Sequence, residues 1–421
     1  MATASVARGS PISPTGGGSP GRALLYFFLA CIASIAAFAQ DLTPPAPQRL
    51  VVHSNILNED RVVWVRMPAA SRGKKDSYPV LYMTDGGSNV NEIGSTIDFL
   101  ADHSIPPLIV VGIANTDRVR DLTPTRADVK ESGGVTSYPT SGGADKFLDF
   151  IGTELTPEIE KRYPTDPYRI ITGHSLGGLF AIHTLVARPN LFNACIASSP
   201  SLWWDGDYTV HEVQKFLATR PEFNRTLFFS LGDEGGDMNE AFEQLQKTVS
   251  DHRPKGFVVQ SARYPEEPHS ETELLTHYAA LRLIFSGWPM PTDPKTHLPI
   301  GGLAGVEKHY RDLSQRFGFK VSAEQAINSL GYSLLGSKKI DEAMAAFERN
   351  VELYPDSANA YDSLADGFSA EGKPGQAMQN VQKAVAVATQ AGDPLLPAFK
   401  RHLESLEAAN KAATSKAGPK Q

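Results

Sequence analysis

Residues 169–187 read RIITGHSLGGLFAIHTLVA, which is the pattern of a strand, a tight turn and a helix. It opens with a β-branched run typical of a buried strand, and residues 179–187 have the composition of a helix. Between them GHSLG, residues 173–177, places Ser175 at the tip of a sharp turn, with a glycine two residues to either side. These glycines let neighbouring backbone approach without a Cβ clash. A serine on a strand–turn–helix unit is in the setting where its hydroxyl can act as a nucleophile.

Strand and helix patterns alternate on both sides of this turn, from about residue 50 to residue 286. Amphipathic stretches such as 144–163 and 238–252 separate short, β-rich apolar runs. Alternation of this kind predicts an α/β fold, with a mostly parallel sheet covered by helices on both faces. The expected strands are 61–67, 79–84, 108–113, 169–172, 194–198, 226–231 and 257–264.

A nucleophilic serine needs a base to take its proton and an acid to orient that base. In the α/β-hydrolase fold the order along the chain is serine, acid, histidine, each at the carboxyl end of a strand. His269 follows the expected strand 257–264 and is the predicted base. His252 and His277 fit less well because they lie in helical patterns, and His174 adjoins the serine.

The acid is expected in GDEGGD, residues 232–237, which follows the strand 226–231. Three carboxylates occur in this segment. Glu234 is the preferred orienter of the base, and Asp233 and Asp237 are the alternatives.

Two backbone N–H groups are expected to stabilise the oxyanion of a tetrahedral intermediate. One belongs to Leu176, directly after the serine. The other is expected in the loop after the strand 79–84, where Gly87 is preferred and Gly86 is the alternative. A plain tight turn is the competing interpretation of this loop.

The first 39 residues are typical of a secretory signal peptide. Arg8 and Arg22 precede an uncharged apolar run, residues 23–39, that ends in small side chains. An uncleaved membrane anchor and a lipid-modified Cys31 are the alternatives. We therefore expect an exported protein, periplasmic or extracellular, that meets a membrane only if the leader is retained.

The pattern changes to helix alone after a proline-rich linker, residues 287–305. A shift of 34 residues superimposes similar side chains, for example Ala326 on Ala360. This period is typical of tetratricopeptide repeats. We expect the catalytic domain to span 40–286, a small all-α, tetratricopeptide-like domain to span 306–408, and the tail 409–421 to be disordered.

Composition and charge exclude several functional classes. The chain has 421 residues with 40 Lys+Arg and 47 Asp+Glu, a net charge of −7, and no dense basic run, which argues against a nucleic-acid partner. Two cysteines exclude a disulfide scaffold or a structural zinc module. The eleven histidines show no pair at zinc-ligand spacing, so no metal site is expected.

The chain resembles the putative esterase family, which includes esterase D and the enterochelin-esterase-like enzymes. The resemblance covers about residues 48–287, and the helical part resembles the branch that carries tetratricopeptide repeats. It rests on PVLYMTDGG (79–87), RVRDLTPT (118–125), the segment from GGADKF to AIHTL (142–185), ASSPSLWW (197–204), LGDEGGDM (231–238) and EEPHSE (266–271).

This resemblance implies an α/β-hydrolase core that uses Ser175, an acid and His269, with no cofactor. It also implies that Trp203, Trp204 and Arg118 line the substrate cleft. From the residues alone, the two tryptophans could equally belong to the core or to an interface.

We therefore expect an exported serine hydrolase that cleaves carboxylic esters through an acyl-enzyme. A siderophore, feruloyl, acetyl or small acyl ester would suit it, either as a small molecule or linked to carbohydrate. Two alternatives stay open. One is an acyltransferase that passes the same acyl group to an alcohol; the other is a scaffold whose repeats bind a protein partner beside a vestigial hydrolase domain.

Overall fold

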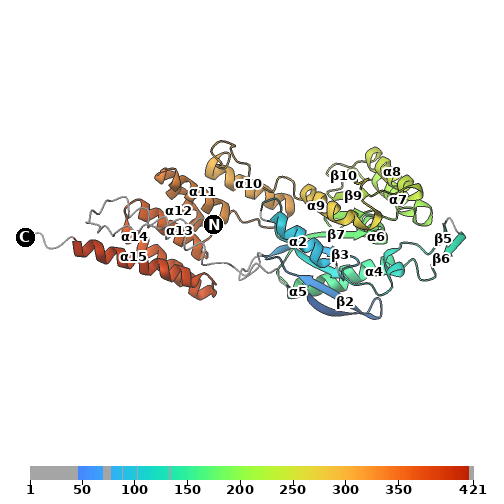
Figure 1. Cartoon of the computed structure of the whole chain (residues 1–421), viewed down its shortest axis with the longest axis horizontal. Coiled ribbons are helices and arrows are strands. Elements are labelled where there is room, and N and C mark those ends of the chain that lie inside the picture. Colours follow the sequence, from blue (N-terminus) through green and yellow to red (C-terminus); the bar gives the residue numbers. More distant parts are fainter. Residues whose placement is uncertain (1–45, 70–76, 88, 102, 132–133, 417–421) are drawn as a thin grey trace, which may run out of the picture. The chain divides into compact units, whose positions relative to one another are not determined.

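The computed structural model describes residues 46–69, 77–87, 89–101, 103–131 and 134–416 (Figure 1). The predicted leader, residues 1–39, lies outside these described residues. None of the helices in the described part of the chain is long and apolar enough to cross a membrane.

A sheet of eight strands forms the centre of the α/β part, in the order β1-β2-β4-β3-β7-β8-β9-β10. From β4 to β10 in this order the strands run parallel to one another. At one edge β2 pairs antiparallel with both β4 and β1. The mostly parallel sheet predicted from the sequence is therefore confirmed. The strands are β1 (Gln48–Ser54), β2 (Glu59–Arg66), β3 (Tyr78–Met83), β4 (Ile109–Ile113), β7 (Thr165–His174), β8 (Ala194–Ser198), β9 (Thr226–Leu231) and β10 (Val258–Arg263).

Three strands were not expected from the sequence. β1 is an edge strand whose residues are mostly exposed or half-buried, so it lacks the apolar run of a central strand. β5 (Asp128–Glu131) and β6 (Gly134–Ser137) form a separate antiparallel ribbon of polar composition.

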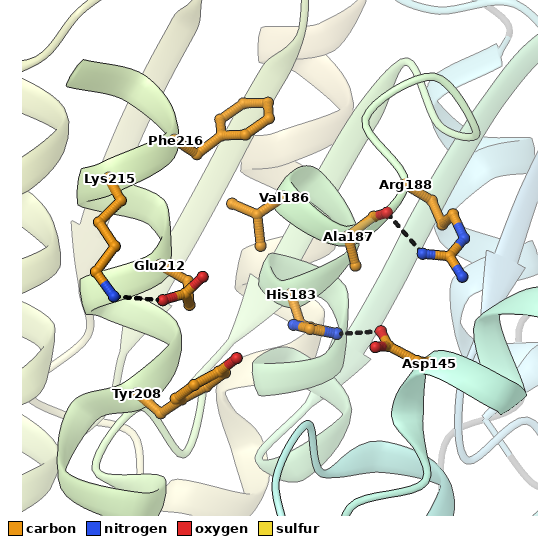
Figure 2. Close-up of a pocket in the computed structure, with 9 residues that line it drawn as sticks. All are labelled: Asp145, His183, Val186, Ala187, Arg188, Tyr208, Glu212, Lys215 and Phe216. Atoms are coloured by element: carbon orange, nitrogen blue, oxygen red, sulfur yellow. Dashed lines mark hydrogen bonds and ion pairs between the residues drawn. The ribbon is translucent and has the colours of Figure 1, made fainter. Parts of the chain in front are cut away.

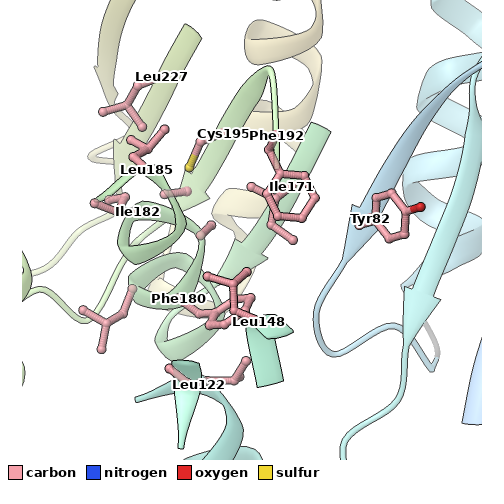
Figure 3. Packing of buried hydrophobic residues seen from close by; sticks show 14 of the residues in the cluster. Tyr82, Leu122, Leu148, Ile171, Phe180, Ile182, Leu185, Phe192, Cys195 and Leu227 are labelled. Carbon is pink, nitrogen blue, oxygen red and sulfur yellow. The ribbon is translucent and has the colours of Figure 1, made fainter. Parts of the chain in front are cut away.

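Helices cover both faces of the sheet. Successive strand residues point to opposite faces, so Ile171 of β7 packs in one layer and Ile170 in the other. Figure 3 shows part of the first layer, around the helix that follows β7. The first layer holds α3 (Arg118–Leu122), α4 (Ala144–Phe150), a π-helical turn (Ile151–Leu155), α5 (Thr156–Arg162), α6 (Leu176–Ala187), α7 (Trp204–Ala218) and α8 (Gly236–Asp251), and the second holds α2 (Val90–Ala101) and α9 (Thr272–Ile284).

The C-terminal part consists of helices. The starts of α11 and α13 are 34 residues apart, at Glu324 and Ala358, so the sequence period corresponds to one helix pair. Close packing explains the small residues of the repeat, because a Cβ on Gly331 would lie 2.5 Å from the ring of Phe347. The helices are α10 (Gly302–Phe317), α11 (Glu324–Gly336), α12 (Ile340–Leu353), α13 (Ala358–Ala370), α14 (Pro374–Ala391) and α15 (Leu396–Lys416).

Two predicted boundaries of this part are wrong. The sequence placed a disordered tail over 409–421, whereas α15 continues to Lys416. Its last turns are rich in alanine and lysine, which favour helix even without burial. The helical part also begins within the expected linker, because α10 starts at Gly302. Leu313 of α10 packs in the same buried cluster as α2 and α9.

Candidate active site

Ser175 lies at a strained turn between β7 and α6. Its backbone has φ +59° and ψ −118°, a conformation that L-residues rarely adopt and that costs about 1–3 kcal/mol. The flanking glycines are required by space: a Cβ on Gly173 would lie 2.4 Å from the backbone of Gly177, and one on Gly177 would lie 2.3 Å from Oγ1 of Thr84. The turn predicted from the sequence therefore has the geometry of a nucleophile elbow.

The hydroxyl of Ser175 lies against a second serine. Its Oγ is 3.1 Å from Oγ of Ser201, and the backbone N–H of Ser201 donates to the carbonyl of Ser175 at 3.1 Å. Ser201 is buried. Within the described part of the chain, no hydrogen bond joins Ser175 to His269; such bonds often tighten only when substrate is bound.

His269 begins a short 3₁₀ helix (His269–Glu271) after β10, and its Nδ1 is hydrogen bonded to Oε1 of Glu234. The Glu234 side chain is only 8% exposed, and its Oε2 has no partner among the described residues. Asp233 and Asp237 are exposed. Of the three carboxylates that the sequence left open, the structure brings Glu234 to the histidine.

The loop after β3 lies beside the turn of Ser175. The N–H of Gly86 donates to the carbonyl of Ile113, and that of Gly87 donates to the carbonyl of Asp85, both at 3.0 Å. A Cβ on Gly86 would collide with the backbone of Gly112 at 2.2 Å, whereas Gly87 has open space around it. Gly86 is thus packed tightly against β4, and the accessible donor of this loop is Gly87.

Leu176 occupies the first position of α6. The N–H groups of a first helical turn have no carbonyl partner four residues earlier. The positive end of the helix dipole also favours negative charge at this point. The N–H of Leu176 is therefore suited to bind an oxyanion formed next to Ser175.

Arg118 connects the two backbone segments around the serine. Its Nε and Nη2 donate to the two carboxylate oxygens of Asp85 at 2.7 and 3.1 Å, and Nη2 also donates to the carbonyl of His174 at 3.2 Å. Asn115 donates to the same carboxylate. No sequence pattern indicates the role of Asp85. Its positive φ of 56° is a feature of the folded loop that no sequence pattern indicates.

The two tryptophans have different positions. Trp204 is 1% exposed, packs in the first layer and donates its indole N–H to Oγ1 of Thr125 at 3.1 Å. The expectation that it lines a substrate cleft is therefore wrong; it is a core residue whose single polar atom is satisfied. Trp203 is half-buried, with its ring 6.1 Å from that of Trp204.

A surface cavity of about 400 Å³ lies elsewhere, between α4, α6 and α7 (Figure 2). Its lining contains none of the predicted site residues. Its charged groups are paired with one another or with neighbours: Asp145 with His183, Glu212 with Lys215, and Arg188 with Asp149. The cavity leaves no unpaired charge to bind a ligand, and we do not assign it to the chemistry of Ser175.

Comparisons with known proteins agree with this geometry. The family described as Putative esterase matches residues 54–250. The chain is 32% identical over 212 residues to the ferri-bacillibactin esterase BesA of Bacillus subtilis. The aligned residues cover 46% of this chain and 73% of that protein. It is 35% identical over 123 residues to the siderophore enterobactin esterase of Emericella nidulans. Here the aligned residues cover 26% of this chain and 41% of that protein.

A solved structure gives the same result. The IroE-like serine hydrolase from Shewanella oneidensis is 27% identical and has a TM-score of 0.65, covering 73% of this chain and 99% of that chain. Sequence, fold and site geometry thus agree. The chain is an esterase of the enterochelin-esterase-like kind and belongs to the putative esterase family.

Proposed function

We propose that this esterase cleaves carboxylic esters through an acyl-enzyme formed on Ser175. The hydrogen bond between His269 and Glu234 carries the proposal. With its Nδ1–H donated to the carboxylate, the imidazole has Nε2 left to accept a proton, which is the arrangement that a general base requires. The carboxylate also stabilises the imidazolium that results.

The first half of the reaction transfers the acyl group. Oγ of Ser175 leaves its contact with Ser201 and attacks the ester carbonyl, while its proton passes to Nε2 of His269. The N–H groups of Leu176 and Gly87 stabilise the oxyanion, the latter in exchange for its bond to the carbonyl of Asp85. Nε2 then returns the proton to the alcohol oxygen as the ester C–O bond breaks.

The second half releases the acid. Water attacks the acyl-serine, its proton passes to Nε2 of His269, and the same two N–H groups stabilise the second oxyanion. The proton then returns to Oγ as the serine ester breaks. Water has added across the ester bond, and the enzyme is restored.

We propose a siderophore ester as the substrate. Relatives from a bacterium and a fungus are named as esterases of ferri-bacillibactin and of enterobactin. Arg118 supports the proposal because its side chain is 34% exposed and, within the described residues, Nη1 has no partner. This free donor is suited to an anionic or phenolic oxygen on the substrate.

We also propose that the protein is exported by its leader, residues 1–39. Recovery from the periplasm or medium of a protein whose N-terminus is near residue 40 is the expected result. A full-length chain confined to the cytoplasm would contradict export without affecting the proposed chemistry.

The chemistry is tested by hydrolysis of p-nitrophenyl butyrate and of a cyclic tricatecholate triester. Wild type is compared with Ser175→Ala and His269→Ala. We expect turnover of both substrates by wild type and a loss of about 10³-fold or more in both variants. Unchanged turnover by folded Ser175→Ala would contradict the proposal. Transfer of the butyryl group to an added alcohol in preference to water would favour an acyltransferase.

A further inference from the structure

His174 directly links the turn of the nucleophile to the loop of the base. Its Nε2 lies 2.7 Å from the backbone carbonyl oxygen of His269, a residue 95 positions later in the chain. A carbonyl oxygen can only accept a hydrogen bond, so Nε2 carries the proton and donates. The two imidazole rings also pack together, with centroids 4.5 Å apart.

The imidazole of His174 is suited to this donor role. Burial lowers its pKa, which keeps the ring neutral at neutral pH and avoids a second positive charge beside His269. The backbone of His174 is held as well, because its carbonyl accepts from Nη2 of Arg118 at 3.2 Å. Arg118 is bound in turn to Asp85, two residues before the predicted oxyanion glycine, Gly87.

Among the residues that the structure describes, the carbonyl of His269 accepts from one further donor. Oγ1 of Thr272 lies 3.4 Å away, a longer contact than that of His174. Thr272 is fully buried and shares its hydroxyl with Ser198 at 2.7 Å and with Ser199 at 3.2 Å. The short bond from His174 is therefore the stronger of the two restraints on the backbone of the base.

We propose that His174 is a positioning residue for the reaction, and that its Nε2–H donation restrains the backbone of His269 so that this base can come within reach of Ser175. The inference rests on the proposed function of Ser175 and His269. No bond joins these two residues in the described part of the chain, so the base must approach the serine in each turnover. If the loop of His269 moves more freely, Nε2 of His269 is within reach of Oγ of Ser175 in a smaller fraction of the enzyme–substrate complexes.

Two amide substitutions distinguish this role from simple packing. The amide nitrogen of His174→Gln can reach the position of Nε2 and donate to the same carbonyl. The shorter side chain of His174→Asn is polar as well but cannot reach it. The two variants have the same functional group and differ in reach alone, so they are matched controls for one another.

The experiment measures kcat and KM for p-nitrophenyl butyrate, together with the rate at which a fluorophosphonate labels Ser175. We expect His174→Asn to lower kcat and the labelling rate about 10- to 100-fold, with KM within about twofold of wild type. We expect His174→Gln to stay within about threefold of wild type in all three quantities. Thermal unfolding of both variants establishes that they are folded.

Equal kcat values for folded His174→Asn and wild type would overturn the proposal. So would a kcat for His174→Gln as low as that of His174→Asn, because donation by Nε2–H would then be irrelevant. A loss seen in KM alone would also overturn it, since that is the signature of a binding role. Failure of the proposed function itself is recognised separately, as full activity in Ser175→Ala.

Discussion

Nδ1 of His269 is hydrogen bonded to Oε1 of Glu234, a carboxylate that lies 35 positions earlier on a different loop. The side chain of Glu234 is almost completely buried, and that of His269 is partly exposed. Because the buried carboxylate binds the ring at Nδ1, it holds the imidazole in a single tautomer and orientation. Glu234 therefore differs from Asp233 and Asp237, the two exposed carboxylates of the same segment, in being paired with the histidine.

The first prediction concerns which of the three carboxylates orients His269. Glu234→Gln keeps the size of the side chain and removes the charge, so the imidazolium loses its stabilisation and kcat falls about 10²- to 10⁴-fold. Asp233→Asn and Asp237→Asn are the matched controls and keep kcat within about threefold of wild type. Steady-state kinetics on p-nitrophenyl butyrate measures all three variants. A larger loss in either control than in Glu234→Gln would reassign the acid.

The second prediction concerns the space around the turn. A Cβ on Gly173 would lie 2.4 Å from the backbone of Gly177, and backbone cannot move aside as a flexible side chain can. Gly173→Ala is therefore expected to lower the free energy of unfolding by about 1–3 kcal/mol. In contrast, Gly375 lies within α14 with open space around it, and Gly375→Ala is expected to raise stability by up to about 1 kcal/mol.

Urea unfolding of the full chain, followed by circular dichroism, measures both substitutions. A Gly173→Ala protein as stable as wild type would show that the turn relaxes more easily than its packing indicates.

The third prediction concerns Arg118. Lysine would keep the positive charge but could not donate to both oxygens of Asp85 and to the carbonyl of His174 at once. We expect Arg118→Lys to lower kcat/KM about tenfold or more through misplacement of the loop and the turn. Asn115→Ala removes only one bond to Asp85 and is expected to have a smaller effect. Equal kcat/KM in wild type and Arg118→Lys would contradict this role.

The fourth prediction concerns pH and the helical part. His402 of α15 is hydrogen bonded through Nδ1 to Asp362 of α13 at 2.7 Å. This bond raises the pKa of His402 above its usual value. The histidine therefore binds its proton more tightly in the folded state, and its contribution to stability is complete below the unfolded pKa of about 6.5. The contribution is lost as pH rises through the folded pKa.

The corresponding measurement compares wild type with His402→Gln. The difference between their unfolding midpoints is expected to be larger at pH 6 than at pH 9. A difference that is independent of pH, or that grows towards pH 9, would show that the ion pair between α13 and α15 does not form.

Much of the α/β part was predictable because local rules determine it. The GHSLG turn needs its glycines, the parallel strands need apolar runs, and the chain order of serine, acid and histidine follows from strand topology. The 34-residue period likewise follows from repeated contacts between paired helices, as at Gly331. The turn, the strands and the repeats require only residues that are near one another in sequence or that recur at a fixed spacing, and the order of the three site residues then follows from the order of the strands.

Other features depend on tertiary contacts that a single sequence does not reveal. The choice of Glu234 over Asp233 and Asp237 is made by where the loop after β9 meets the loop after β10. Trp204 could not be placed because a tryptophan next to a predicted cleft and one in a core have the same pattern. Ser201 lies in the ASSPSLWW segment, but its contact with Ser175 arises only when the loop after β8 packs against the turn.

The central claim is that Ser175 becomes acylated during turnover. Acid quenching of wild type during hydrolysis of p-nitrophenyl butyrate, followed by peptide mass spectrometry, tests it directly. We expect one butyryl group on the peptide that contains Ser175 and none on the same peptide from Ser175→Ala, which is inactive. Rapid hydrolysis by wild type with no acylated peptide, and with turnover retained in Ser175→Ala, would show that the reaction does not pass through an acyl group on Ser175.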